Sequence, residues 1–299
     1  MTKMLGRFTF ALIFVTRPLL AGDVTVETYR GPMTVSTSPE TIAVFDIAAL
    51  DSLEALGVKP DGVVEKVYLP FLEESAENTV SVGSLFEPDF EAVNALAPDL
   101  IIAGGRSHEE VPNLAELAPT IDMTIWEDVI GQGLDRLSAY GDIFEKQNEA
   151  AELRSQFLAK LEVAKAAVAG KGAALIVMTN GPKVSAYGSS GRFGWLHQAL
   201  GLPEAIADVE QTTHGEAISF EFIRDVDPDI LLVVDRLAAT GQAGETAEVT
   251  LDNALVRETK AWKSGQVIYL SSAPIYIAGG GIQSMNITLD ELLAAFQDG

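Results

Sequence analysis

The chain has 299 residues, a length that allows two domains with an ample hydrophobic core. Its formal net charge of −23 argues against nucleic acids and anionic membrane surfaces as partners. The sequence contains no cysteine, so we expect no disulfide, no thiolate metal site and no lipid-anchoring cysteine. With 47% hydrophobic and 21% charged residues, the composition is that of a globular protein.

The N-terminus has the pattern of an export signal. Lys3 and Arg7 precede the apolar run FTFALIFVT, and Ala21 offers a small-residue cleavage point. Removing residues 1–21, which contain three basic and no acidic residues, takes the net charge from −23 to −26. The apolar run is too short to span a bilayer, and no later run is long enough. We therefore expect a soluble periplasmic protein that is not lipid-anchored.

The first half of the chain alternates strand and helix patterns. Alternating apolar and polar residues around Gly31-Pro32 predict a hairpin over 24–35. A strand at 41–45 and a helix at 47–56, closed by Gly57, form a β–α unit. The further elements expected here are strands at 63–69, 80–82 and 120–126 and a helix at 111–117. Residues 133–169 are helical in pattern, and a break near Gly141 would leave 145–169 as one long connecting helix.

The chain contains one internal repeat, formed by residues 86–106 and 216–236. Aligning Pro98 with Pro228 superimposes the two copies without a gap. Each copy predicts a short amphipathic helix, a Pro-Asp stop and an apolar strand of the kind buried in parallel sheets.

Each copy of the repeat ends in an arginine, Arg106 in the first and Arg236 in the second. Open α/β sheets bind ligands beyond the carboxyl ends of their strands, which is where both arginines are expected. The matched pair predicts two α/β lobes, each offering a cation to a shared cleft. Asp235 should project to the other side of its strand, so it is a poor counter-ion for Arg236.

The second half repeats the α/β pattern. Its predicted elements are strands at 173–178, 183–187 and 266–270 and helices at 192–200, 252–260 and 288–296. The predicted fold class is therefore α/β, with two lobes built on parallel-rich sheets and joined by a single long helix. The predicted boundaries are 1–21 for the signal, 22–143 for the N-terminal lobe, 144–170 for the connecting helix and 171–299 for the C-terminal lobe.

Several isolated residues are candidates for chemistry. The loop GSSGRF suits an anion, because Ser190 can cap the following helix and Arg192 adds charge, although such loops usually serve only as turns. His197 is expected to be packed in a helix, and His108 to lie in a solvated loop or at a cleft rim. For His214 the sequence leaves a ligand role open. No close histidine pair is present, so a dedicated zinc or manganese site is not expected.

Six segments carry a family resemblance: PDLIIAGGR, YGSSGRFGWLHQALG, THGEAISFEFI, PDILLVVDR, LDNALV and YIAGGG. They resemble the substrate-binding proteins of iron–siderophore ABC importers, and most of all the branch that captures ferric catecholates. The likeness runs from about Thr25 to the C-terminus and is most specific over 187–236. It implies the class III periplasmic binding protein fold, with an Fe(III)–siderophore as ligand and no intrinsic cofactor.

The resemblance also implies roles for named residues. Arg106, Arg192 and Arg236 would form a cationic floor for the anionic iron–catecholate, which would offset the cost of burying three guanidinium groups. His214 and Tyr276 would complete the iron coordination where the siderophore leaves positions open. From the residues alone, Tyr276 is either packed at the sheet edge or a phenolate donor suited to Fe(III).

Two further features follow from the resemblance. Glu91 and Glu221, one in each lobe, match the glutamates that dock onto the permease, although alone they read equally as solvated charges. Pro274 and Ile275 stand where aromatic residues are expected before Tyr276, which leaves the catechol-contacting wall and the siderophore preference open.

The sequence therefore predicts a monomeric binding protein without catalytic activity that delivers its ligand to an inner-membrane ABC permease. A single bridging helix predicts small hinge movement on binding. The alternatives are a binding protein for haem, a corrinoid or a hydroxamate siderophore, an exported hydrolase, and a periplasmic adaptor that binds only protein. The hydrolase is disfavoured because no nucleophile elbow is present.

Overall fold

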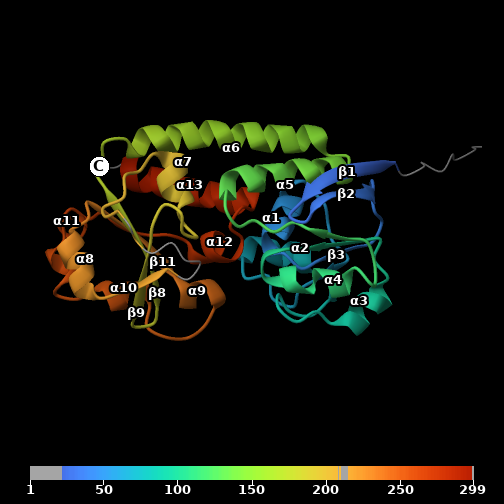
Figure 1. The fold of residues 1–299 in the computed structure, drawn as a ribbon, viewed down its shortest axis with the longest axis horizontal. Helices are drawn as coiled ribbons and strands as arrows, with labels where there is room; N and C mark the ends of the chain where they lie inside the picture. The colour runs from blue at the N-terminus through green and yellow to red at the C-terminus, as the bar shows by residue number, and fades with distance from the viewer. Residues whose placement is uncertain (1–21, 208, 210–214, 298–299) are drawn as a thin grey trace, which may run out of the picture.

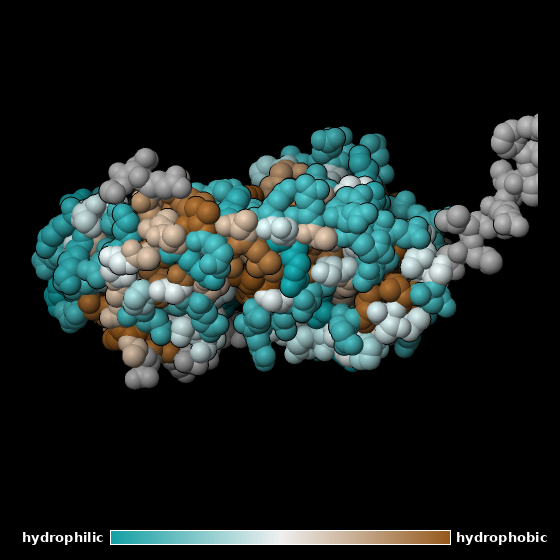
Figure 2. Space-filling view, turned by 90° about the horizontal axis from the view of Figure 1, so that it is seen from above, coloured by the Kyte–Doolittle hydropathy of each residue, from teal (hydrophilic) through white to brown (hydrophobic). Residues whose placement is uncertain are grey.

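The computed structural model describes residues 22–207, 209 and 215–297, which form two α/β lobes side by side (Figure 1). The expected signal segment and His214 lie outside the described residues. Within the described part of the chain, no helix is long and apolar enough to cross a membrane. Figure 2 views the molecule from above, and polar residues cover most of that face, with apolar residues gathered near its middle.

The N-terminal lobe is built on a five-stranded, fully parallel sheet with the order β5-β4-β3-β6-β7. Its strands are β3 (Ile42–Val44), β4 (Gly62–Val63), β5 (Val80–Ser81), β6 (Leu100–Ala103) and β7 (Thr120–Asp122). The predicted hairpin is present as β1 (Asp23–Thr28) and β2 (Gly31–Ser36). The helical segments are α1 (Ile47–Ala55), η1 (Pro70–Leu72), α2 (Glu73–Ala76), α3 (Phe90–Leu96), η2 (Gly105–Glu110), α4 (Val111–Leu114) and α5 (Val129–Ile143).

The C-terminal lobe has a mixed five-stranded sheet with the order β10-β9-β8-β11-β12, in which β8, β11 and β12 are parallel. Its strands are β8 (Ala174–Asn180), β9 (Lys183–Tyr187), β10 (Glu216–Ile218), β11 (Ile230–Asp235) and β12 (Val267–Tyr269). The helical segments are α7 (Trp195–Leu200), α8 (Phe220–Val226), α9 (Arg236–Thr240), α10 (Ala247–Leu251), η3 (Val256–Glu258), α11 (Lys260–Lys263), α12 (Ser272–Ile277) and α13 (Ile282–Gln297).

The two copies of the repeat fold alike. Helices α3 and α8 both have seven residues, and each ends at a residue in the left-handed conformation, Ala97 (φ 49°) and Asp227 (φ 48°). The following Asp99 and Asp229 accept backbone N–H bonds that fix the start of β6 and β11 beside β3 and β8. The repeat predicted from the sequence is thus one structural unit used twice.

The chain passes between the lobes through α6 (Gln147–Val168), which runs along the top of both in Figure 1. Helix α5 continues through Gly141 and ends at Ile143, so the predicted break lies slightly too early. A Cβ at Gly141 would approach Ala150 Cβ to 2.8 Å. The glycine therefore allows α5 and α6 to pack closely.

The C-terminal helix α13 forms a second contact between the lobes. It begins at Ile282, six residues before the predicted start. Asp51 of α1 caps it from the N-terminal lobe: its Oδ1 accepts the Gln283 N–H at 2.8 Å, and its Oδ2 accepts the N–H of Ser284 at 2.9 Å and its hydroxyl at 2.7 Å. A cap that comes from a residue so distant in the sequence leaves no local pattern.

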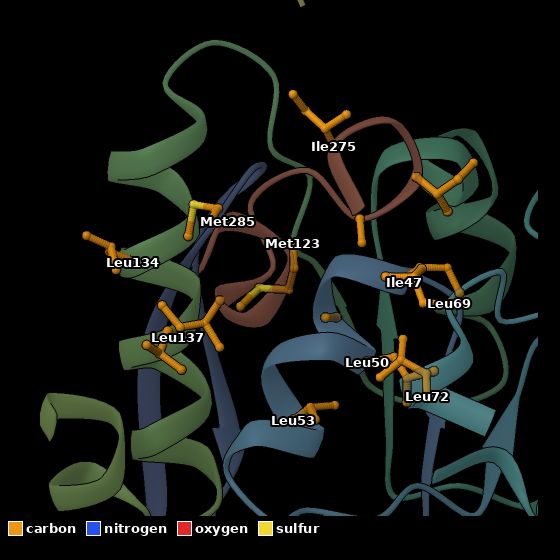
Figure 3. Packing of buried hydrophobic residues seen from close by; sticks show 14 of the residues in the cluster. Ile47, Leu50, Leu53, Leu69, Leu72, Met123, Leu134, Leu137, Ile275 and Met285 are labelled. Atoms are coloured by element: carbon orange, nitrogen blue, oxygen red, sulfur yellow. The ribbon is translucent and has the colours of Figure 1, made fainter. Parts of the chain in front are cut away.

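The hydrophobic core extends from the N-terminal lobe into this junction. In Figure 3, Met285 of α13 lies beside Leu134 of α5 and near Met123, which follows β7. On the other side of α1, Leu50 lies close to Leu72. Because these side chains are almost completely buried, α13 completes the core of a lobe that the chain left more than 100 residues earlier.

Two local predictions were wrong. The strand expected at 63–69 is limited to β4, after which the chain turns through Tyr68, whose φ is 64°. The helix expected at 252–260 is divided into η3 and α11, because Thr259 takes an extended conformation and its hydroxyl accepts the Trp262 N–H.

Candidate ligand-binding site

A cavity of about 740 Å³ lies between the lobes. Its N-terminal side is formed by residues just beyond the carboxyl ends of β3, β6 and β7, namely Asp46, Gly105, Arg106 and 125–127. Its C-terminal side is formed by the loop 190–192, by Trp195 and Gln198 of α7, and by residues of α12. This is where open α/β sheets place ligands.

A smaller cavity of about 200 Å³ adjoins the first, because Arg192 and Tyr276 line both. Its other lining residues belong to β8, β9 and the start of α9, and they include Lys183 and Arg236. The smaller cavity therefore contains three cationic side chains and no carboxylate, whereas the larger contains two arginines and two carboxylates, Asp46 and Glu127.

The three arginines predicted from the sequence converge on Tyr276. The Tyr276 carbonyl oxygen accepts hydrogen bonds from Arg106 Nη2 at 3.0 Å and from Arg192 Nη2 at 2.8 Å. Arg236 Nε donates to the Tyr276 hydroxyl oxygen at 3.3 Å. The Arg192 guanidinium carbon also lies 4.2 Å from the centre of the tyrosine ring, a cation–π distance.

These guanidinium groups have no carboxylate partner within ion-pair distance among the described residues. Burial and the nearby Arg106 lower the pKa of Arg192 below its ordinary value, although the group stays cationic at neutral pH. Burial alone would raise the pKa of Tyr276, but the Arg192 charge and the Arg236 hydrogen bond outweigh it and lower the pKa. The site is therefore a local excess of positive charge in an acidic protein.

Local folding explains why Arg236 does not form an ion pair with the neighbouring carboxylate. It is the first residue of α9, and the neighbouring Asp235 is buried as the cap of that helix. The Asp235 carboxylate accepts the N–H groups of Ala238 at 3.0 Å and Ala247 at 2.8 Å. As expected from the sequence, Asp235 does not pair with Arg236; the structure adds that backbone N–H groups occupy its carboxylate.

The loop that carries Arg192 differs in detail from the prediction. Ser190 does not cap α7, which begins at Trp195 after Gly194. Instead, Ser189 holds the loop in place: its N–H donates to Glu204 Oε1 at 2.7 Å, and its hydroxyl donates to Glu204 Oε2 at 3.0 Å. A Cβ at Gly194 would meet the Ser189 carbonyl oxygen at 1.9 Å, so the close packing of this loop requires glycine at that position.

The described histidines are structural. His197 is buried, with Nδ1 2.9 Å from the Leu202 carbonyl oxygen, in agreement with the packed role expected for it. The solvated-loop interpretation of His108 is wrong: its Nδ1 lies 2.8 Å from Asp122 Oδ2, and its ring packs edge-on against Tyr29. Arg30 binds the same carboxylate oxygen at 2.8 Å, which ties this cluster to the hairpin.

Sequence reasoning missed several lining residues. Asp46 directly follows a predicted strand, so the strand-end argument used for the arginines could have found it. The aromatic residues Phe86, Trp126 and Trp195 also line the larger cavity. They come from three separate loops and helices, and no spacing in the sequence links them.

One contact joins the lobes away from both cavities. Lys66 Nζ donates to the Thr240 carbonyl oxygen of α9 at 2.6 Å and lies 4.7 Å from the centre of the Tyr68 ring. Gly241 follows in the left-handed conformation (φ 66°), and a Cβ there would lie 2.9 Å from the Lys66 ammonium. The lysine therefore bridges the N-terminal lobe and the end of the helix that begins with Arg236.

The two glutamates that the resemblance assigns to docking occupy equivalent places. Glu91 and Glu221 are exposed residues in the first turns of α3 and α8. Both helices are followed in the chain by strands, β6 and β11, that lead to the arginines of the cleft.

The fold and the cleft define a two-lobed ligand-binding protein, and comparison with known proteins agrees. The chain belongs to the periplasmic binding protein family, whose sequence model matches residues 42–274. This confirms both the fold class and the family resemblance found in the sequence.

Individual relatives span most of the chain. The petrobactin-binding protein YclQ of Bacillus subtilis is 34% identical over 263 residues, covering 86% of this chain and 83% of its own. The ferric-anguibactin-binding protein FatB of Vibrio anguillarum is 31% identical over 287 residues, covering 93% and 89%. The crystal structure of the periplasmic catecholate-siderophore binding protein VctP from Vibrio cholerae has a TM-score of 0.86 at 29% identity, covering 91% of this chain and 100% of that chain.

Proposed function

We propose that this protein captures an Fe(III)–siderophore of the catecholate type and delivers it to an inner-membrane ABC permease. The observation that carries the proposal is the convergence of Arg106, Arg192 and Arg236 on Tyr276 without carboxylate partners. Ferric catecholates are anionic, and charge-assisted hydrogen bonds from guanidinium groups match their oxygen atoms. The catecholate-siderophore binding protein VctP supports this ligand class, and the petrobactin- and ferric-anguibactin-binding relatives support the capture of a ferric siderophore.

The proposal gives Tyr276 a second role as an iron ligand. The positive charge around its hydroxyl lowers its pKa, which favours the phenolate, a hard oxygen donor suited to Fe(III). We propose that Tyr276, together with His214, occupies coordination positions that the siderophore leaves open. Replacing Tyr276 with Phe should then shift the charge-transfer absorption of the bound ferric complex, whereas an unchanged spectrum would exclude direct coordination.

Delivery requires a surface that the permease can recognise. We propose that Glu91 and Glu221 provide it, since both are exposed on equivalent helices, one in each lobe. We further propose that residues 1–21 direct export and that the protein acts in the periplasm as a monomer without catalytic activity. The proposed N-terminal lobe ends at residue 143, and the proposed C-terminal lobe begins at residue 171. Charge reversal of both glutamates should abolish uptake in cells without changing ligand affinity.

A fluorescence titration tests the ligand class. Trp126 and Trp195 line the larger cavity, so a bound iron complex should quench their emission. We expect tight quenching by a ferric bis-catecholate and little response to ferric hydroxamate, haem or iron-free catecholate. Tighter binding of haem or hydroxamate, with no effect of Arg236→Ala, would overturn the catecholate assignment.

A further inference from the structure

The lining of the larger cavity includes acidic residues that an anionic chelate does not explain. They are Asp46 and Glu127 of the N-terminal lobe, and together with Trp126 we call them the wall. The smaller cavity, by contrast, offers Lys183, Arg192 and Arg236 with no acidic residue. The binding space as a whole is therefore polarised, with a purely cationic part and a part that mixes both signs of charge.

Asp46 is held in place by the helix that it caps. Its Oδ1 accepts the Ala49 N–H at 2.8 Å, and it stands at the positive N-terminal end of α1. The residue is partly exposed, and it borders the cavity. On its other side, Gly105 leaves it room, because a Cβ there would lie 3.0 Å from Asp46 Oδ2. Removal from water raises the pKa of Asp46, while the Ala49 N–H bond and, to a smaller extent, the Arg106 charge act in the opposite direction.

The backbone of Trp126 and Glu127, which line the same cavity, is also held in place in the unliganded protein. The side-chain oxygen of Gln132 on α5 accepts the N–H groups of Trp126 at 2.9 Å and Glu127 at 3.4 Å. The Trp126 side chain is 45% exposed, so its ring is available to a ligand. The larger cavity is thus lined by an aromatic ring and two carboxylates, groups that suit an ammonium ion.

We propose that this wall binds a protonated amine carried by the ferric siderophore, with Asp46 as the carboxylate that pairs with it. The inference rests on the proposed function and adds that the ligand carries a cationic group beside its iron centre. A ligand that is anionic throughout would be repelled by Asp46 and Glu127. A ligand with an anionic iron centre and a cationic arm matches both parts of the cavity.

The competing explanation is that Asp46 serves only to cap α1 and to balance the charge of Arg106. The two explanations predict different results for Asp46→Asn, a change that keeps the cap because asparagine is an equally good N-cap residue. If Asp46 only balances Arg106, its neutralisation should strengthen the binding of every anionic ferric chelate by the same factor. If it binds an amine, neutralisation should weaken only the ligand that carries the amine.

The test uses two ferric bis-catecholates with the same iron-binding groups, one with a terminal primary amine and one with that amine acetylated. We expect the wild-type protein to bind the amine form at least tenfold more tightly, and Asp46→Asn to reduce this ratio to about one. Asp89→Asn is a matched control, since Asp89 caps α3 in the same way but does not line the cavity, and it should keep the wild-type ratio.

The outcomes separate this inference from the proposed function. If the wild-type protein binds both chelates equally, or Asp46→Asn leaves the preference intact, the amine site is refuted while siderophore binding stands. If neither ferric chelate binds to the wild-type protein, the proposed function itself fails. A preference that weakens with added salt in the wild type, and not in Asp46→Asn, would further support an ion pair.

Discussion

Arg192 is the residue whose replacement tests the site most directly, because it lines both cavities. We consider Arg192→Met, which keeps most of the side-chain volume and removes the charge. In the unliganded protein the change removes one hydrogen bond of 2.8 Å to the Tyr276 carbonyl oxygen and one cation–π contact of 4.2 Å. That carbonyl oxygen retains the hydrogen bond from Arg106, so no buried acceptor is left unpaired.

The expected effects on stability and on binding therefore differ. The hydrogen bond and the cation–π contact together are worth about 2–4 kcal/mol. Replacing a buried charge with an apolar side chain returns a similar amount, about 1–4 kcal/mol. These opposing terms largely cancel, so we expect the free energy of unfolding of the ligand-free protein to change by no more than about 3 kcal/mol. Loss of a buried, charge-assisted contact to the ligand should instead cost about 2–5 kcal/mol, or at least about 30-fold in affinity.

Denaturant unfolding of the ligand-free protein and titration with ferric bis-catecholate measure the two quantities separately. Arg154→Met is a suitable control, because Arg154 lies on the exposed side of α6 in a 3.6 Å pair with Asp135, and it should change neither value appreciably. Binding of the ferric complex by Arg192→Met within twofold of the wild type would refute the assignment. A large loss of stability would show that Arg192 is mainly structural.

Three further predictions concern the contacts between the lobes. Burial raises the pKa of Asp51 to about 7, so the contribution of this residue to stability is greatest below about pH 4 and decreases as the pH rises through 7. Asp51→Asn should therefore flatten the dependence of the melting temperature on pH between these values. An unchanged slope would contradict the assignment. Gly281→Ala should lower the free energy of unfolding, measured by denaturant titration, by about 1–3 kcal/mol, since the new Cβ would lie 2.6 Å from Asp51 Cγ. Gly22→Ala is the control: its Cβ would lie 3.6 Å from the nearest atom, and the change should be neutral. Lys66→Ala should increase both the association rate and the dissociation rate of the ligand in stopped-flow measurements, because the Lys66–Thr240 hydrogen bond restrains lobe movement without reaching the cavity. A change confined to the dissociation rate would instead indicate that Lys66 contacts the ligand directly.

Local sequence patterns predict part of the fold and part of the binding site. The repeat was recognisable because the same helix, Pro-Asp stop and apolar strand occur twice, and each of these features acts over a few residues. Arg106 and Arg236 could be assigned to the cleft for the same reason, since the end of a parallel strand fixes where the next residues lie. The convergence of these arginines on Tyr276 is consistent with that assignment.

Other parts depend on contacts between distant residues and were not predictable in this way. The early start of α13 depends on Asp51, more than 200 residues away in the chain. Tyr276 belongs to the short helix α12, although the sequence indicated only the end of a strand. The wall formed by Asp46 and Trp126 arises because separate strands of one sheet end at the same edge, and no spacing between these residues reflects that.

The packing of α13 has a consequence for the order in which the protein can fold. Met285 completes the core around Leu134 and Leu137, so the N-terminal lobe lacks part of its interior until nearly the whole chain is available. Contacts between residues so far apart in the sequence form slowly, because a long loop must close first. A chain that crosses a membrane from its N-terminus onward would therefore remain unable to finish its first lobe during most of its passage.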